Sequence, residues 1–336
     1  PDPFQFPQSF GHPVDAESLA AWGKAIIEQT TDLVCCYKPN IAFYEQFGLE
    51  GLEALQRTLA VIPDDIPVLL DAKRGDIGST ATAYARAAFE VLGVDAVTVS
   101  PYLGQDAVAP FLGYAGKAVF VLCYTSNPSA AAVQEFGDGQ TRLFEHIVNQ
   151  ATQWGEPDQI GFVVGATQPE ALARVRSLLA GRYHWILAPG VGAQGGDLAG
   201  ALAAGLDDHG SGLIVPVSRH IICADSPRAA ALVLRDEINQ ARTSVGKRAA
   251  APVKGPLDPL AALILHLHDA GCVRLGEFTL ASGLHSPIYI DLRRMASEPG
   301  LLRQAAQAYA GLLAPLRYER LAAVPYAALT IGTQKI

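Results

Sequence analysis

Residues 68–80 read Val-Leu-Leu-Asp-Ala-Lys-Arg-Gly-Asp-Ile-Gly-Ser-Thr, an apolar run that passes directly into alternating charges. The run predicts a buried strand, and the two-residue period of a strand places Asp71 and Lys73 on one side of its end. A solvated charge cluster could give the same Asp-x-Lys-x-x-Asp string by chance. Its position at the carboxyl end of a strand favours a site, because β/α barrels keep their chemistry there.

Around this strand, short apolar runs alternate with longer Ala- and Leu-rich segments between residues 17 and 240, as in repeated βα units. The runs lack clean alternation, as expected for strands buried on both faces. Seven strands are one short of a (β/α)8 barrel, and the opening Pro1-Asp2-Pro3 reads as a loop. We therefore expect a TIM barrel whose first strand is missing. The predicted strands are Leu33–Tyr37, Val68–Asp71, Ala96–Ser100, Ala118–Cys123, Gly161–Val164, His184–Ala188 and Leu213–Val217.

The composition indicates a globular, soluble protein. Half of the 336 residues are hydrophobic, and the net charge of −8 argues against a nucleic-acid surface, which needs clustered Lys and Arg. No run approaches the roughly 20 apolar residues of a membrane span, so we expect no membrane contact and a cytoplasmic location. The cysteines show no metal-ligand spacing and predict free thiols rather than a metal site; they are residues 35, 36, 123, 223 and 272.

Polar residues also follow other predicted strands. Lys38 ends the run Leu33–Tyr37 and is followed by Pro39 and Asn40; an exposed loop lysine is the alternative. Residues 124–129, Tyr-Thr-Ser-Asn-Pro-Ser, offer hydroxyl and amide groups to a polar ring, although a plain turn would have the same composition.

A glycine-rich run, Ala188–Asp197, follows a late strand and opens a helix. Its glycines allow backbone N–H groups to approach an anion, and a helix start favours negative charge. Arg219 emerges at the end of the next strand, and barrels commonly hold phosphate between these two loops. Gln194 and Arg219 therefore predict a phosphate site, with a ligand-free βα turn as the alternative.

Taken in order, these segments resemble orotidine 5'-phosphate decarboxylase, in the bacterial branch that carries Asp-Ala-Lys-Arg-Gly-Asp-Ile-Gly-Ser-Thr after strand three. The resemblance covers residues 1 to about 240. It implies conversion of orotidine 5'-monophosphate to uridine 5'-monophosphate in pyrimidine synthesis, without metal or cofactor, through a C6 carbanion that Lys73 protonates. It also implies a homodimer with shared sites. The implied charged tetrad is Lys38, Asp71, Lys73 and Asp76, of which Asp76 reaches across the dimer interface into the partner's site together with Ile77 and Thr80. The implied substrate contacts are Asn40, Ile77, Thr80, Ser126, Pro189, Gly190, Gln194 and Arg219.

The remainder of the chain reads as a linker and a second domain. Residues 241–259 are Ala-, Pro- and Lys-rich and predict a linker. A helix is expected at Leu260–Leu267 and a hairpin at Phe278–Ile290, turning at Ser282-Gly283. Residues 260–336 resemble the N-terminal part of orotate phosphoribosyltransferase, a partial α/β domain, in the segments Gly276–Gly283, Ser286–Arg293 and Val324–Leu329. No transferase activity is expected, because the sequence stops before that family's catalytic loop and Ala281 replaces a common lysine.

Two other interpretations stay open. The metal-dependent 3-keto-gulonate 6-phosphate decarboxylases share the barrel and the Asp-x-Lys-x-x-Asp string, but Ser126-Asn127-Pro128 and Gln194 favour the nucleotide enzyme. The chain could instead be a non-catalytic or poorly folded remnant, because both of its ends look cut. In addition, relatives place a ribose-binding aspartate just before the segment that matches Pro1-Asp2-Pro3. On that basis we expect impaired turnover that an N-terminal extension restores.

Overall fold

The computed structural model describes residues 15–180, 182–192, 195–249, 259–279, 285–291 and 299–313. The chain divides into two compact units, residues 1–250 and 251–336. Of the residues that carried sequence predictions, Pro1–Pro3, Gln194, Ala281, the hairpin turn and 324–329 lie outside the described part. Within that part, no helix is long and apolar enough to cross a membrane.

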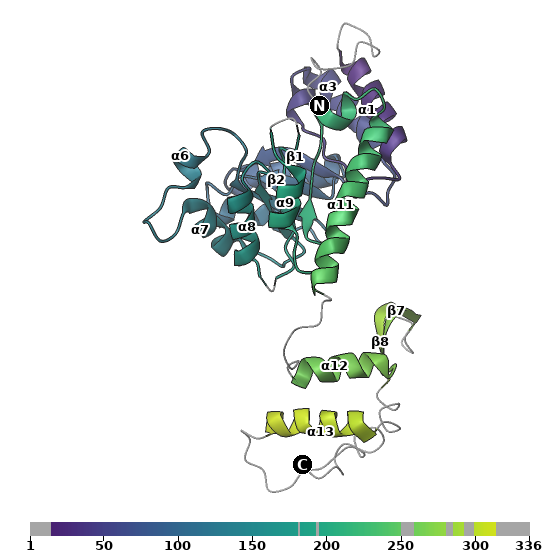
Figure 1. The fold of residues 1–336 in the computed structure, drawn as a ribbon. Coiled ribbons are helices and arrows are strands. Elements are labelled where there is room, and N and C mark those ends of the chain that lie inside the picture. The colour runs from purple at the N-terminus through teal and green to yellow at the C-terminus, as the bar shows by residue number, and fades with distance from the viewer. Residues whose placement is uncertain are drawn as a thin grey trace. The chain divides into compact units, whose positions relative to one another are not determined.

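The first unit is built on a curled parallel sheet with helices around it (Figure 1). Its described strands follow one another in chain order, each paired with the next, as repeated βα units require. They are β1 Leu69–Arg74, β2 Ala96–Val99, β3 Ala118–Tyr124, β4 Ile160–Val164, β5 Ile186–Leu187 and β6 Leu213–Ile214. The arrangement is a half-barrel of the TIM-barrel type.

Helical segments connect the strands of this unit. Helix α1 begins with a capping box, in which Asp15 accepts from the Ser18 backbone N–H and Ser18 accepts from that of Asp15. The segments are α1 Ala16–Thr30, α2 Ala42–Glu45, α3 Gly48–Leu59, α4 Gly78–Arg86, the π-helix η3 Ala87–Val91, the 3₁₀ turn η4 Gln105–Ala107, α5 Ala109–Leu112, α6 Ala131–Gln134, α7 Leu143–Ala151, α8 Pro169–Leu178, α9 Leu198–Gly205, α10 Arg219–Ile222 and α11 Pro227–Ala249.

The predicted strand Leu33–Tyr37 is wrong in its position. Pairing with the β1 segment begins at Tyr37 and reaches Asn40, and it consists of isolated bridges. The Tyr37 N–H donates to the carbonyl of Pro67, and the carbonyl of Pro39 accepts from the Asp71 N–H. Because a proline has no N–H to donate, the two prolines interrupt the ladder here. The extended segment nevertheless carries Lys38 to the end of β1.

The predicted linker begins too early. Helix α11 continues through residues 241–249, which are rich in helix-forming Ala, Arg and Lys. The hydroxyls of Thr243 and Ser244 donate to carbonyls four residues back, and Arg242 Nε donates to the carbonyl of Gly210 in the first unit. These contacts make residues 241–249 part of that unit.

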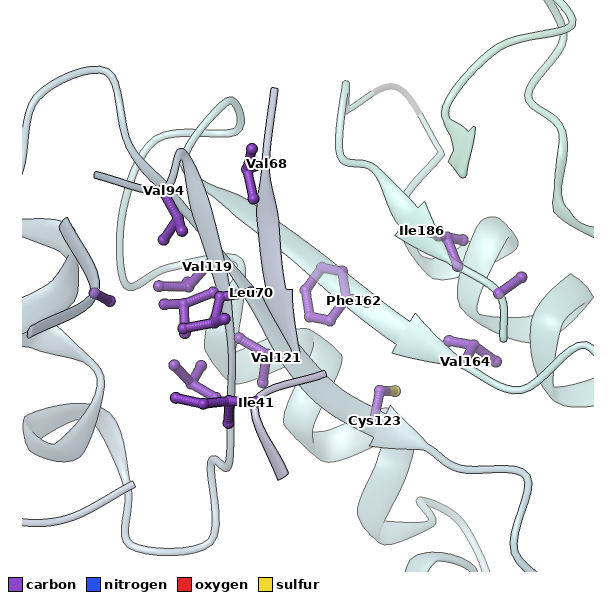
Figure 2. Close-up of a cluster of buried hydrophobic side chains, with 14 of the residues drawn as sticks. Ile41, Val68, Leu70, Val94, Val119, Val121, Cys123, Phe162, Val164 and Ile186 are labelled. Carbon is purple, nitrogen blue, oxygen red and sulfur yellow. The ribbon is translucent and has the colours of Figure 1, made fainter. Parts of the chain in front are cut away.

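Both faces of the sheet are buried, which explains the lack of alternation in the strand sequences. One face packs against the helices and includes Leu70, Val121 and Val164 (Figure 2). The opposite face forms a separate cluster of Leu69, Ala96, Phe120, Val163 and Leu187. We call the face of this second cluster the inner face of the sheet. Asp71 lies two residues beyond Leu69 in β1, and Thr98 lies two residues beyond Ala96 in β2, so both side chains continue the inner face toward the carboxyl ends of the strands.

The second unit contains α12 Pro259–Asp269, β7 Val273–Thr279, β8 His285–Ile290 and α13 Pro299–Leu313. Its strands pair antiparallel, so the predicted helix and hairpin are both present. The hairpin begins at Val273 rather than Phe278, because Val273 pairs with Ile290. A small core lies between the helices and includes Leu263, Cys272 and Leu302.

Candidate active site

Asp71 stands at the centre of a charged cluster at the carboxyl end of β1. Its Oδ2 accepts a hydrogen bond from Lys38 Nζ at 2.8 Å, and its Oδ1 accepts one from Lys73 Nζ at 2.5 Å. Burial raises the pKa of the Asp71 carboxyl, but the two lysine charges outweigh it, so the pKa lies below its usual value. Asp71 is therefore ionised at neutral pH.

The two lysines differ in exposure. The side chain of Lys38 is 19% exposed and that of Lys73 is 50% exposed, while Asp71 is 14% exposed. Lys38 is held inside the cluster, whereas the ammonium of Lys73 is open to a molecule that approaches the rim. The sequence prediction that Asp71 and Lys73 come together is confirmed.

Their approach depends on a bulge rather than on a regular strand. Leu70 pairs with Val97 and Arg74 with Val99, so three residues of β1 lie opposite Thr98 alone. Lys73 has a φ of +48°. No other non-glycine residue in the described part of the chain has a positive φ. Such a backbone costs about 1–3 kcal/mol and clusters at functional sites.

Thr98 was not recognised in the sequence analysis, although it lies within the site. It is 1% exposed, and its Oγ1 accepts from the N–H groups of Ala72 at 3.0 Å and Lys73 at 2.9 Å. A sequence signal exists: a lone threonine inside the apolar run Ala-Val-Thr-Val must find a hydrogen-bond partner when both faces are buried.

Asp76 does not join the cluster within this chain. Its Oδ1 accepts from the Ile77 N–H at 2.7 Å, and no ion pair connects it to another described residue. Ile77 is 59% exposed and Thr80 is also exposed, at the start of α4. Within one chain the charged tetrad is thus a triad of Lys38, Asp71 and Lys73, with Asp76 outside it.

Two further predicted contacts are held by their surroundings, Asn40 by a hydrogen bond and Ser126 by packing. Asn40 Oδ1 accepts from the Ala42 N–H at 3.1 Å, which orients the amide beside the Lys38 segment. Ser126 follows β3 and lies tightly against Gly165, where a Cβ would come within 3.0 Å of the Ser126 nitrogen. The backbone at Ser126 is therefore fixed by packing against the end of β4.

The glycine-rich loop adopts a closed turn next to α10. Gly190, Gly192 and Gly195 have φ of +109°, +73° and +83°, conformations that favour glycine. The carbonyl of Pro189 accepts from the Ala166 N–H at 2.7 Å. The Cβ of His220 lies 3.8 Å from the position that a Cβ of Gly192 would take, so the exposed Arg219 starts a helix beside this loop.

One expectation about this loop is wrong. The carboxylate of Asp197 accepts from the N–H groups of Ala199 at 3.2 Å and Gly200 at 2.8 Å. The start of α9 is therefore capped by the chain's own carboxylate and does not offer these donors to an anion. An anion here would depend on the loop itself and on Arg219.

Enzymes of the β/α-barrel type carry their active sites at the carboxyl ends of the parallel strands. The Lys-Asp-Lys cluster lies at this end of the sheet, so the fold and the site together indicate an enzyme of this type. Residues 15–233 match the family described as Orotidine 5'-phosphate decarboxylase / HUMPS family, and the chain belongs to this family.

Relatives extend over both units. A "Bifunctional enzyme PyrF/PyrE" of Nostoc sp. is 41% identical over 99% of this chain and 71% of its own length. An orotidine 5'-phosphate decarboxylase of Thermomicrobium roseum is 48% identical over 74% of this chain and 91% of its own. The solved Leishmania donovani UMP synthase has a TM-score of 0.67 at 45% identity, covering 96% of this chain and 69% of that one.

Proposed function

We propose that the first unit decarboxylates orotidine 5'-monophosphate to uridine 5'-monophosphate, a step of pyrimidine synthesis. The observation that carries the proposal is the Lys38-Asp71-Lys73 cluster, found in a chain that is 43–48% identical to several proteins named orotidine 5'-phosphate decarboxylase. The enzyme is a carboxy-lyase.

The chemistry needs a fixed cation beside C6 of the pyrimidine. When the C6–carboxylate bond breaks, CO2 leaves and the electron pair stays on C6. The half-exposed Lys73 ammonium stabilises this charge and then transfers a proton to C6, and the resulting amine regains a proton from solvent. The ionised Asp71 holds the Lys73 ammonium through one oxygen, and Lys38 binds the other Asp71 oxygen.

Binding of the substrate phosphate contributes further to lowering the free-energy barrier of decarboxylation. One cation contact contributes a few kcal/mol, whereas demanding reactions need barrier reductions up to about 23 kcal/mol. We assign the phosphate to the loop of Pro189 and Gly190 with Gln194 and Arg219, and the pyrimidine to Ser126 and Asn40. Interactions made far from C6 then help to order the site.

Two variants test this division of roles. Lys73→Ala should remove nearly all turnover and leave the affinity for uridine 5'-monophosphate within about tenfold, because its contact develops in the transition state. Arg219→Ala should mainly raise KM. Lys117→Ala is the control, because Lys117 pairs with Asp95 at the opposite ends of the strands. Equal losses in kcat and affinity for both variants would contradict the assignment.

A second copy of the chain completes the site in this proposal. The supporting observation is that Asp76 makes no ion pair with the described residues of its own chain, while Ile77, Thr80 and the 86% exposed Tyr102 lie at the surface. Mixing Lys73→Ala with Asp76→Ala subunits should regenerate one intact site in each mixed dimer, and so about a quarter of wild-type activity. Two inactive proteins that stay inactive after subunit exchange would exclude shared sites.

The metal-dependent sugar-phosphate decarboxylase is the alternative. Both oxygens of Asp71 are engaged by lysine ammonium groups, which favours a reaction run by fixed cations of the protein. We therefore expect turnover of orotidine 5'-monophosphate to persist after exhaustive EDTA treatment. Loss of activity that Mg²⁺ restores would support the sister class.

For the second unit we propose a segment related to orotate phosphoribosyltransferase. Support comes from the bifunctional relative, whose similarity extends over nearly the whole chain, and from the antiparallel hairpin at the position of the family-like segments.

A further inference from the structure

We propose that Thr98 is a positioning residue for decarboxylation: its single hydroxyl holds the bulge that presents Lys73 and orients the carboxylate of Asp71. The proposal rests on the proposed function and adds a residue that touches neither the reacting atoms nor the substrate. Thr98 lies in β2, is 1% exposed, and continues the inner face of the sheet above Ala96.

The direction of the Thr98 hydroxyl proton follows from counting donors and acceptors. A threonine hydroxyl donates one hydrogen bond and accepts two. The N–H groups of Ala72 and Lys73, at 3.0 and 2.9 Å, fill both acceptor positions of Oγ1. The remaining contact, Asp71 Oδ1 at 3.2 Å, must therefore receive the O–H proton.

The same Asp71 oxygen receives Lys73 Nζ at 2.5 Å, whereas Lys38 binds the other oxygen. Thr98 thus orients Asp71 Oδ1, the oxygen that binds the proposed proton donor Lys73. One hydroxyl therefore binds both the carboxylate of Asp71 and the backbone N–H of Lys73. As a result, the Lys73 residue is held at its backbone and, through Asp71, at its ammonium group.

The bulge explains why a side chain is needed. Between the pairs Leu70–Val97 and Arg74–Val99, three residues of β1 lie opposite one residue of β2, so the regular ladder does not supply one carbonyl for each β1 amide there. Buried N–H groups without partners are strongly unfavourable. Thr98 Oγ1 accepts from the amides of Ala72 and Lys73 in place of a carbonyl and allows Lys73 to keep φ of +48°.

The test compares Thr98→Val, which keeps the shape and removes the hydroxyl, with Thr98→Ser, which keeps the hydroxyl. Thr98→Val should lower kcat by about ten- to a hundredfold, because small displacements of a reacting group have effects of this size. Affinity for uridine 5'-monophosphate should stay within about threefold, and Thr98→Ser should retain most of kcat.

A split between kcat and binding separates positioning from simple destabilisation. In Thr98→Val, kcat per folded active site should fall while the affinity for uridine 5'-monophosphate changes little, because the hydroxyl orients Lys73 and Asp71 and does not contact the ligand. Thr58→Val is the matched control: Thr58, in α3, is also buried and its Oγ1 donates to the carbonyl of Ala54 at 2.8 Å. It should lower Tm and leave kcat per folded active site unchanged.

The outcomes are distinguishable. If wild type does not turn over orotidine 5'-monophosphate, the proposed function is wrong. If wild type is active and folded Thr98→Val keeps its kcat, or if Thr98→Ser is equally impaired, the positioning role is wrong. Should Thr98→Val not fold, Thr98→Ala gives the same comparison, with active sites counted by uridine 5'-monophosphate binding.

Discussion

Single residues set the geometry of the rim, and Gly75 is one at which a side chain would be crowded. It follows the Lys73 bulge, and a Cβ at this position would lie 3.0 Å from the Ser100 carbonyl oxygen and 3.2 Å from the Ser100 Cβ. Ser100 is itself tied by its N–H to the carbonyl of Arg74 at 2.7 Å. The neighbouring strand therefore cannot move away without breaking that bond.

We expect Gly75→Ala to lower the free energy of unfolding by about 1–3 kcal/mol and to reduce kcat, because the strain falls on the segment after Lys73. Gly113→Ala is the control, since Gly113 has a right-handed helical backbone and the nearest atom to its Cβ would be 3.6 Å away. Urea unfolding and turnover of both variants measure the effect. If Gly75→Ala and Gly113→Ala caused equally small changes in unfolding free energy and kcat, Ser100 would be able to move away from the added Cβ at little cost.

Cys35 is a second residue with a specific chemical expectation. A hydrogen bond from Cys36 lowers the pKa of the Cys35 thiol to about 6, although partial desolvation of that thiol acts in the opposite direction, and the charge of Arg242 contributes. Since the thiolate is the reactive form, alkylation of Cys35 by iodoacetamide should rise through about pH 6 rather than pH 8.5. Cys36→Ser should change this midpoint, and mass spectrometry of the labelled peptide reports it. A midpoint near 8.5 in wild type would contradict the hydrogen bond.

At the scale of elements, apolar runs were sufficient to predict β1 to β6, because strands buried on both faces must be apolar. Breaks in regular pairing were not predictable. The bulge at residues 71–73 depends on Thr98 from another strand, and the isolated bridges at Tyr37 and Asn40 depend on two prolines from different segments. The charged cluster was predicted because its members follow strand ends, whereas Thr98 was missed because it lies inside one.

Glu145 connects two elements of the first unit. It lies near the start of α7 and is 5% exposed; it accepts from the Arg142 N–H at 2.9 Å and from Arg174 Nε of α8 at 2.6 Å. Burial raises its pKa, but the hydrogen bonds from Arg142 and Arg174 outweigh burial and lower the pKa to about 2. The ionised form therefore stabilises the fold.

Because the folded pKa is below the unfolded value of about 4.3, this contribution is present above that value and is lost as the pH falls toward about 2. Glu145→Gln should lower the free energy of unfolding at pH 7 by about 1–2 kcal/mol and flatten its dependence between pH 5 and 2. Glu28→Gln, which alters an exposed i,i+4 pair, should change neither. Denaturant titrations across this pH range provide the measurement. An unchanged slope in Glu145→Gln would place the acid-sensitive group elsewhere.

In the molecule as a whole, the residues of the candidate active site all lie in the first of the two units. Lys38, Asp71, Lys73 and Arg219 all belong to residues 1–250, and the second unit has its own small core around Leu263 and Leu302. The boundary is set by α11, whose last turns the sequence analysis assigned to a linker. The position of this boundary has consequences that two truncations can measure.

A chain that ends at Ala250 should retain kcat and KM for orotidine 5'-monophosphate within about a factor of two, because a domain with its own core folds without its neighbour. A chain that ends at Gln240 loses Arg242, whose Nε donates to the Gly210 carbonyl at 2.8 Å between α9 and β6. Because that carbonyl is then left without this donor, the shorter chain should have a lower Tm, and Arg242→Ala in the longer chain should reproduce part of the loss. If both truncated chains were equally stable, residues 241–249 would act as a linker after all. If both lost activity, the decarboxylase unit would require residues 251–336.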